Sequence, residues 1–284
     1  MELQNKLSPV MLQNGVGVPC IGYGTWQTPD GETAAESVRM ALEAGYRHID
    51  TAASYGNEAS VGEGIRRSGV ARSEIFLTSK LANSDHGYDA TRAAFEQSLK
   101  RLGTDYLDLY LIHWPNPVAC RDHWQEANAG TWKAMEELYE AGQIRAIGVS
   151  NFFPHHLQAL AETANVAPMV NQISLSPGRA QEAVCAYSRE QGMVLEAYSP
   201  LGTGRLLQLP LLKTLAEKYQ RSAAQICVRW SLQMGFLPLP KSTNPERIRQ
   251  NAAVFDFALS EEDMAALIAL EREGPAPDPD KITF

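Results

Sequence analysis

The sequence predicts an α/β fold, a closed (β/α)8 TIM barrel with an N-terminal β-hairpin. Three observations lead to this prediction. Short apolar segments with the character of β-strands alternate with longer amphipathic segments along the chain. A glycine follows many of the amphipathic segments, where its freedom to adopt a positive φ can end a helix. No linker or low-complexity stretch divides the 284 residues, so we expect a single domain over residues 1–284.

The elements are expected in a regular order. The hairpin comes first: Asn14-Gly15, within residues 12–16, suits a tight turn, and the hairpin would close the bottom of the barrel. Each later strand is followed by a helix, as shown by the apolar face of Phe95, Leu99 and Leu102. Such units pair in parallel through right-handed crossovers, and eight of them in a chain of this length favour a closed barrel over an open sheet.

The predicted strands are Cys20–Thr25, Arg47–Asp50, Ile75–Ser79, Tyr106–Ile112, Arg145–Ser150, Met169–Ile173, Val194–Tyr198 and Phe236–Pro240. The predicted helix-ending glycines are Gly45, Gly69, Gly103, Gly142, Gly192 and Gly235. Only the stretch from residue 274 to the end reads as an irregular tail.

Composition and charge exclude several classes of protein. The net charge of −8 argues against a nucleic-acid partner, which normally requires a basic face. No apolar run approaches the ~18 residues of a membrane span, and the first residues lack the apolar core of a signal peptide. The four cysteines show no CxxC spacing. We therefore expect a monomer in the reducing cytoplasm, with no membrane or nucleic-acid partner.

Four residues stand at or near the ends of predicted strands: Asp50, Tyr55, Lys80 and His113. Because the carboxyl ends of parallel strands meet on one face of a barrel, these side chains should lie together. A tyrosine has an ordinary pKa of ~10, and a nearby ammonium lowers it. Tyr55 would then be a proton donor tuned toward working pH by Lys80 and Asp50, with His113 directing a substrate oxygen. Such a set suits carbonyl reduction by a hydride cofactor.

Other interpretations of these residue types remain open. A single Asp, Lys or Tyr at a strand end more often caps a helix or packs locally, and His113 could be a buried structural histidine. A metal site is not expected, because adjacent residues such as His155 and His156 do not share a helix face. His86 and His123 are isolated in predicted loops.

Five stretches resemble motifs of the aldo-keto reductase family. The resemblance runs from about residue 12 to residue 270, and the motifs occur in the family's order. It implies a barrel that binds NADPH without a Rossmann fold, and this chain has no GxGxxG after its first predicted strand. The stretches are GYRHIDTAASYGNE at 45–58, LYLIHWP at 109–115, GVSNF at 148–152, AYSPLG at 197–202 and LPKSTNPERI at 239–248.

The resemblance assigns expected roles to individual residues. Tyr55 would be the general acid, supported by Lys80 and Asp50, and His113 would orient the carbonyl. Ser150, Asn151 and Gln172 would bind the nicotinamide carboxamide, and Tyr198 would stack on its ring. The remaining residues expected to contact NADPH are Thr25, Ser199, Leu201, Gly202, Lys241, Ser242, Arg247, Gln250 and Asn251.

The expected phosphate site also has a basis in the sequence itself. Residues 243–246, Thr-Asn-Pro-Glu, form a good helix start, with a capping residue followed by proline. Lys241, Ser242 and Arg247 surround that N-terminus, which already favours anions. A solvated helix start with incidental charges is the plainer alternative. The resemblance implies a clamp for the 2′-phosphate and hence a preference for NADPH over NADH.

Three departures from the family pattern bear on the substrate. Ala82 stands where an aromatic residue is common, Ser174 and Ser176 replace a usual Glu and His, and the tail is short. The chain looks closest in kind to short prokaryotic members such as the 2,5-diketo-D-gluconate reductases. Substrate walls are expected from Trp26, Trp114 and Trp124. A subunit that senses NADPH with little turnover, and a metal-dependent barrel hydrolase, are the alternatives.

Overall fold

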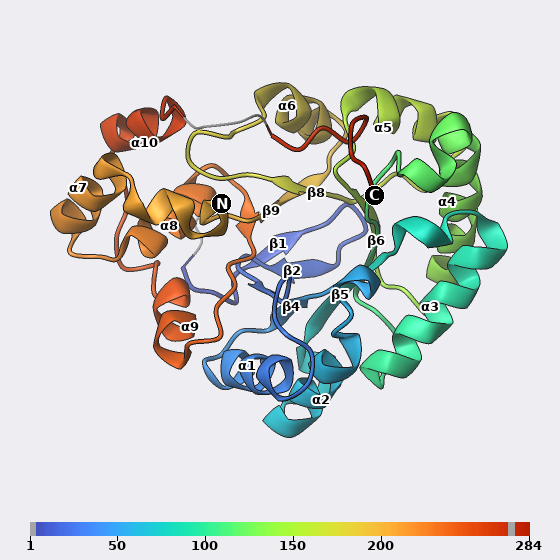
Figure 1. Cartoon of the computed structure of the whole chain (residues 1–284), viewed down its shortest axis with the longest axis horizontal. Helices are drawn as coiled ribbons and strands as arrows, with labels where there is room; N and C mark the ends of the chain where they lie inside the picture. Colours follow the sequence, from blue (N-terminus) through green and yellow to red (C-terminus); the bar gives the residue numbers. More distant parts are fainter. Residues whose placement is uncertain (1–3, 272–275) are drawn as a thin grey trace.

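The computed structural model describes residues 4–271 and 276–284, and its centre is a parallel β-barrel. Eight strands pair in sequence order, each with the next (Figure 1). Gly22 N–H and Gly24 N–H donate to Pro238 O and Pro240 O, at 3.0 and 3.2 Å, and so join the first strand of the barrel to the last. The strands are β3 Tyr23–Gly24, β4 His48–Asp50, β5 Phe76–Leu81, β6 Leu109–Ile112, β7 Ile147–Ser150, β8 Val170–Ser174, β9 Val194–Tyr198 and β10 Leu237–Pro238. The predicted barrel and its strands are confirmed.

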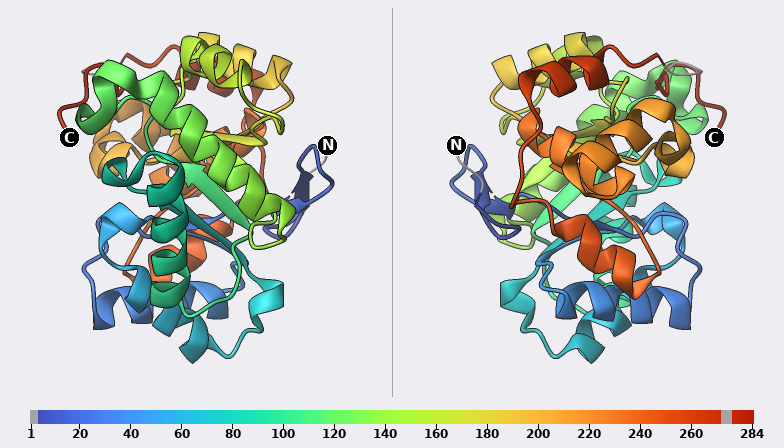
Figure 2. Two further views of the ribbon diagram at one scale, coloured as in Figure 1. Left: turned by 90° about the vertical axis from the view of Figure 1, so that its right-hand side faces the viewer. Right: turned by 90° about the vertical axis from the view of Figure 1, so that its left-hand side faces the viewer.

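Helices surround the barrel on the outside (Figures 1 and 2). They are α1 Glu32–Glu43, α2 Glu58–Ser68, α3 Tyr88–Leu102, α4 Trp124–Glu140, α5 Pro154–Ala161, α6 Glu182–Glu190, α7 Pro210–Tyr219, α8 Ala223–Gln233, α9 Pro245–Ala252 and α10 Glu261–Ile268. The glycines predicted to end helices all have positive φ, between 66° and 87°. None of the helices in the described ranges is long and apolar enough to cross a membrane.

An antiparallel hairpin precedes the barrel and closes one of its ends. Strands β1 (Pro9–Met11) and β2 (Gly17–Pro19) are joined by a turn in which Gly15 has φ 82°. The side chains of Gln13 and Asn14 donate to Gln191 O and Arg145 O, which lie just before β9 and β7. The hairpin therefore covers the N-terminal ends of the strands, as predicted.

Close packing of the strands requires glycine at one position in particular. A Cβ on Gly148 in β7 would lie 2.7 Å from Val170 O and 2.8 Å from the Leu111 side chain. Both contacts are with the neighbouring strands β8 and β6, so a larger residue would push the barrel wall apart. Because the hairpin covers the N-terminal ends of the strands, the opposite end, where the strands finish, is the open face of the barrel.

The C-terminal tail returns to that open face. The backbone of residues 276–284 forms no helix or strand. Asn116 Nδ2 donates to Asp280 Oδ1 at 2.9 Å, and Arg121 Nη2 donates to Ile282 O at 2.6 Å. Because residues 116 and 121 follow β6, the tail packs over the loop beyond that strand. The irregular tail was predicted from residue 274, and residues 274 and 275 lie outside the described ranges.

Candidate active site

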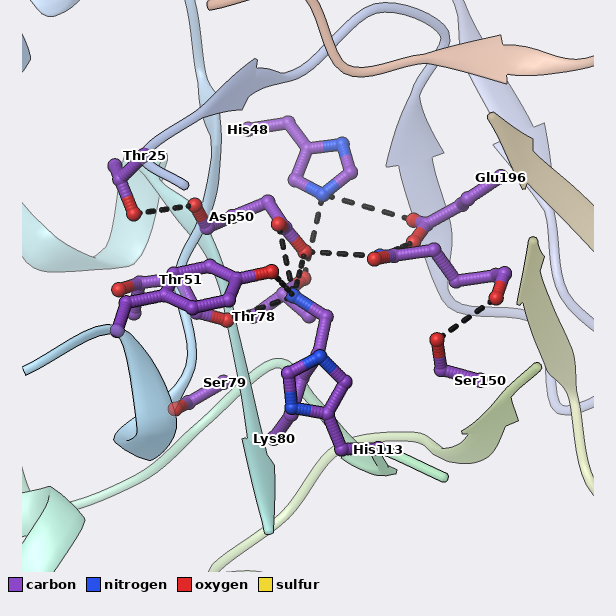
Figure 3. A network of polar contacts seen from close by, with 12 residues as sticks. Thr25, His48, Asp50, Thr51, Thr78, Ser79, Lys80, His113, Ser150 and Glu196 are labelled. Carbon is purple, nitrogen blue, oxygen red and sulfur yellow. Dashed lines mark hydrogen bonds and ion pairs between the residues drawn. The ribbon is translucent and has the colours of Figure 1, made fainter. Parts of the chain in front are cut away.

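Three of the four residues singled out in the sequence, Asp50, Lys80 and His113, lie close together where their strands end (Figure 3), and the Tyr55 hydroxyl lies beside Lys80. Asp50 ends β4, and Tyr55 ends the single 3-10 turn Ala53–Tyr55 that follows it. Lys80 lies in β5, and His113 directly follows β6. Lys80 is fully buried, and its Nζ donates to both carboxylate oxygens of Asp50 at 2.8 Å and to Thr51 O at 2.8 Å. A buried ammonium held in this way has a fixed position.

The Tyr55 hydroxyl lies beside that ammonium. Lys80 Nζ is 3.4 Å from Tyr55 Oη, and the ring of His113 meets the Tyr55 ring edge-on at a centroid distance of 5.7 Å. His113 Nδ1 is 3.2 Å from Ser54 Oγ, so a hydroxyl in the same turn fixes the other side of the imidazole. Tyr55 and His113 are both half-buried.

The protonation states follow from burial and from the Asp50–Lys80 pair. Burial, the largest single effect, lowers the pKa of Lys80, but the charges and hydrogen bonds of Asp50 and Tyr55 together outweigh it, so the pKa of Lys80 is raised and the ammonium stays charged. Burial lowers the pKa of His113 well below its usual value, and the charge of Lys80 lowers it further, so the imidazole is neutral.

The expectation for Tyr55 needs a correction. Burial raises the pKa of the Tyr55 phenol, and this exceeds the lowering effect of the Lys80 charge. The expectation that Lys80 would bring the pKa of Tyr55 down toward working pH is therefore wrong in its net direction. The phenol is protonated at neutral pH, which is the form that a proton donor requires.

A ring of amide and hydroxyl groups continues from the four residues through β7, β8 and β9. Ser150 Oγ donates to Gln172 O at 2.8 Å, and Asn151 Nδ2 donates to His113 O at 3.0 Å. Tyr198 Oη donates to Asn151 Oδ1 at 2.8 Å. Gln172 Nε2 donates to Asp50 Oδ2 at 2.9 Å and to Glu196 Oε2 at 2.7 Å. Both N–H bonds of Gln172 are thus in use, and its amide oxygen is the atom left for a ligand.

The residues expected along a pyrophosphate follow β9. Ser199 has φ 50°, and Gly202 N–H donates to Ser199 O at 2.9 Å, which turns the chain sharply at the barrel rim. Leu201 lies within this turn, before the 3-10 segment Gly202–Gln208. Thr25 is different, because its buried hydroxyl already donates to Asp50 O at 3.0 Å.

The predicted helix start at residues 243–246 is confirmed as the N-terminus of α9. Asn244 caps it by accepting from Arg247 N–H at 3.0 Å, and Pro245 is the first helical residue. Lys241 Nζ donates to Gln27 O at 3.2 Å, and Ser242 is half-buried beside it. Arg247 is exposed in the first turn.

The two amide residues farther along α9 differ in exposure. Gln250 Nε2 donates to Glu246 Oε1 at 3.0 Å, whereas Asn251 is buried. Lys241 and Arg247 thus lie on either side of the capped helix start in sequence, and a helix N-terminus with cations near it attracts anions.

Comparison with known proteins identifies the family. The profile described as "Aldo/keto reductase family" matches residues 20–272. The chain belongs to this family. It is an NADP-dependent oxidoreductase that reduces carbonyl groups, as the sequence predicts.

Three similar proteins illustrate the relationship. Glyoxal reductase of Bacillus subtilis (strain 168) is 50% identical over 276 residues, which are 97% of either chain. The crystal structure of an aldo/keto reductase from Brucella melitensis superposes with a TM-score of 0.88 at 45% identity, covering 95% of this chain and 100% of the other. The crystal structure of a Bombyx mori aldo-keto reductase in complex with NADP superposes with a TM-score of 0.83 at 39% identity, covering 92% of this chain and 91% of the other. The likeness to 2,5-diketo-D-gluconate reductases stays a prediction.

The tryptophans expected to form the substrate walls of this reductase have different surroundings. Trp114 stacks beside His113 at 6.4 Å and meets the ring of Phe284 edge-on at 5.5 Å. Trp26 is 45% exposed. Trp124 packs against the rings of His155 and His156, at 6.3 and 4.9 Å. Trp114 is thus in contact with the four-residue site.

His155 and His156 of the reductase do converge, contrary to the expectation that adjacent residues on a helix could not. Both rings lie in the first turn of α5, and their Nε2 atoms approach the Asp280 carboxylate at 3.2 and 2.9 Å. His156 Nδ1 accepts from Phe153 N–H at 3.1 Å, so its Nε2 carries the proton that Asp280 accepts. That nitrogen has no lone pair to offer a metal, and the cluster anchors the tail instead.

Glu196 and Phe284 are among the residues at this site that were not singled out in the sequence. Glu196 is buried and bonded to Gln172; because side chains alternate along a strand, its position two residues before Tyr198 was a usable signal. Phe284 reaches Trp114 only through the path of the tail, for which the sequence carries no local signal.

Proposed function

We propose that Tyr55 is the general acid of an NADPH-dependent reduction of small aldehydes and ketones. The observation that carries this proposal is the position of Tyr55 Oη, 3.4 Å from Lys80 Nζ, which itself lies 2.8 Å from both Asp50 oxygens. When the phenol releases its proton, the fixed ammonium stabilises the phenolate that forms. Asp50 keeps Lys80 charged and in place.

His113 directs the substrate in this proposal. Its imidazole is neutral, and Ser54 Oγ lies 3.2 Å from Nδ1. With Ser54 donating to Nδ1, Nε2 carries a hydrogen and can donate to the carbonyl oxygen. The oxygen then has two donors, the His113 N–H and the Tyr55 O–H, which polarise the carbonyl and protonate the product alkoxide.

The polar residues in or directly after β7, β8 and β9 suit the nicotinamide of the cofactor, and the residues at the start of α9 suit its 2′-phosphate. Gln172, with its uncommitted amide oxygen, and Ser150 and Asn151 would hold the carboxamide, and Tyr198 would cover the ring. NADPH supplies the hydride when it is bound. Lys241, Ser242 and Arg247 at the start of α9 would hold the 2′-phosphate, a group that NADH lacks.

The substrate class follows from the relatives and from the residues near His113. A relative 50% identical to this chain is a glyoxal reductase, and we infer that this chain also accepts α-oxoaldehydes. Ala82, the residue directly after β5, leaves the pocket without an aromatic side chain there, and Trp114 with Phe284 closes another side. We also infer a cytoplasmic monomer in which residues 1–284 form one domain.

The test is NADPH oxidation with glyoxal by the wild type and by Tyr55→Phe. Removing the proton donor should lower kcat by roughly 10²–10⁴-fold. NADPH affinity, measured by fluorescence titration, should change little. Tyr187→Phe, a change of the same size on α6, is the matched control and should keep the wild-type rate. Equal rates for Tyr55→Phe and the wild type would refute the assigned acid.

The second candidate function is an NADPH-sensing subunit with little turnover. The assembled Asp50, Lys80, Tyr55 and His113 argue against it, because binding alone does not require a proton donor beside a buried ammonium. Tight NADPH binding without turnover across a panel of aldehydes, keto-sugars and keto esters would favour it.

A further inference from the structure

A second buried carboxyl group, that of Glu196, lies near Asp50 and His48 (Figure 3). Glu196 in β9 is 0% exposed. Its Oε2 accepts a hydrogen bond from Gln172 Nε2 at 2.7 Å, and the same nitrogen donates to Asp50 Oδ2 at 2.9 Å. One amide therefore bridges two buried carboxyl groups, and only one of these, Asp50, also contacts Lys80.

The charges around Glu196 do not balance a second carboxylate. The groups that face it are Asp50 and His48 from β4, Lys80 from β5 and Gln172 from β8. Lys80 is the one cation among them, and both of its short contacts to carboxylate oxygen go to Asp50. Burial lowers the pKa of His48 to about 4, so this histidine is neutral and supplies no positive charge.

Glu196 also lacks the hydrogen bonds that a buried carboxylate needs. Its Oε1 has no hydrogen-bond partner among the described residues, and His48 Nε2 is 3.6 Å away, too far for one. A carboxylate in this position would keep a single hydrogen bond after losing its water, which is costly. Burial is the main reason that the pKa of Glu196 is raised to about 8, and the negative charge of Asp50 is the second.

We propose that Glu196 is a positioning residue that works as a neutral, protonated acid. It holds the amide of Gln172 so that one N–H points to Asp50 and the amide oxygen faces the cofactor side. It does so without placing a second negative charge beneath Lys80 and Tyr55. The inference rests on the proposed function of Gln172, Asp50 and Tyr55.

Ionisation of Glu196 should therefore weaken the reaction. The new charge draws the Gln172 amide away from Asp50 and adds a negative potential beside the ammonium that must stabilise the phenolate. The acid is neutral below its pKa of about 8, so carbonyl reduction should fall as pH rises through that value. The pKa of Tyr55 is raised above its ordinary value, so loss of the phenol proton belongs to a higher pH.

Glu196→Gln tests this proposal because it keeps the size of the side chain and fixes it as neutral. At neutral pH, kcat/KM with glyoxal should stay within about 3-fold of the wild type, since the amide oxygen still accepts from Gln172. The pH at which kcat/KM of this variant begins to fall should be higher than in the wild type by about one pH unit or more. Glu196→Leu, which leaves one Gln172 N–H without a partner, should raise the Kd for NADPH by roughly 10-fold.

A readout independent of turnover comes from infrared spectroscopy. The wild type should show a buried protonated carboxyl band that disappears as the pH rises through about 8 and is absent from Glu196→Gln. Glu136→Gln is the control. Glu136 is a buried glutamate on α4 whose carboxylate accepts hydrogen bonds from the backbone N–H groups of Asn165 and Val166. Its replacement should leave the pH profile and this band unchanged.

Two results would overturn the assignment. One is a Glu196→Gln enzyme with an unchanged alkaline limb. The other is a large loss of activity at neutral pH with no protonated band in the wild type, which would show that Glu196 works as a carboxylate. A wild type inactive toward every aldehyde would instead overturn the proposed function.

Discussion

Lys80 is the residue on which the geometry of the site depends most directly. Its ammonium has no exposure, and Asp50 and Thr51 O accept its hydrogen bonds. Burying an ion pair costs desolvation energy that the attraction between the charges only roughly offsets, so the pair adds little net stability. Breaking it is different, because the remaining charge is left buried without a partner. The pair is therefore best explained by its role beside Tyr55.

We expect Lys80→Met to lower both stability and activity, for separable reasons. The unpaired Asp50 carboxylate should reduce the free energy of unfolding by about 3–5 kcal/mol. In Asp50→Asn/Lys80→Met both charges are gone, so most of that loss should be recovered while NADPH oxidation stays low. Urea unfolding and a glyoxal assay measure the two effects. A double variant as unstable as Lys80→Met would contradict the charge argument.

That Asp50, Tyr55, Lys80 and His113 lie together could be predicted from the sequence, but their protonation could not. Asp50 and Lys80 stand at strand ends, and that pattern alone placed them on one face of the barrel. The pKa of Tyr55 depends on how deeply its ring is buried between residues distant in sequence, and burial reversed the predicted direction. Glu196 was missed because its role depends on a contact with Gln172 in the neighbouring strand, although its position two residues before Tyr198 places it on the same face of β9.

Helix α9 shows how a local signal can specify an element. Asn244 and Pro245 are a cap and a first helical residue by their own conformational preferences, so the helix start was predicted to the residue. The helix N-terminus carries a partial positive charge, and Lys241 and Arg247 add full charges on either side of it in sequence. Such an element favours a ligand with a phosphate at this end.

We expect Arg247→Met to weaken NADPH binding by roughly 10–100-fold, the worth of a charge-assisted hydrogen bond to phosphate. NADH binding should change by less than about 3-fold, because NADH lacks the 2′-phosphate. Arg249→Met is the matched control, since Arg249 lies on the same helix but pairs with Glu246 at 2.9 Å. Fluorescence titration with both cofactors measures the effect. An equal loss for NADH and NADPH would place the phosphate elsewhere.

Contacts between elements were less predictable than the elements themselves. The strand order and the helix-ending glycines follow from patterns within about ten residues. The meeting of His155 and His156 at Asp280 joins residues more than a hundred positions apart. It also depends on two neighbouring rings, 3.8 Å apart, leaning the same way from the first turn of α5. Residue spacing along a helix does not predict that two adjacent side chains contact the same distant carboxylate.

At the scale of the whole molecule, burial of histidines makes folding sensitive to acid. The chain has six histidines, and the pKa is lowered for four of them: His48, His86, His113 and His156. Burial is the largest cause in each case. His156 has a pKa of about 4 in the folded state, against an ordinary value of 6.5. Between pH 4 and pH 6.5 it therefore binds fewer protons in the folded state than in the unfolded state. Its contribution to stability is therefore present above 6.5 and is lost as the pH falls toward 4.

We therefore expect the free energy of unfolding to decrease steeply as the pH falls from about 6.5 to about 5, before most carboxylates titrate. One such histidine contributes a slope of about 1 kcal/mol per pH unit, so His156→Asn should reduce the slope by that amount. His123→Asn, the same change at an exposed site beside Asp122, is the matched control. Urea unfolding at several pH values measures it. His156→Asn also releases Asp280 and will lower stability at every pH, but a constant offset does not change a slope. An unchanged slope would mean that His156 is protonated in the folded enzyme and holds the tail as a charged pair with Asp280.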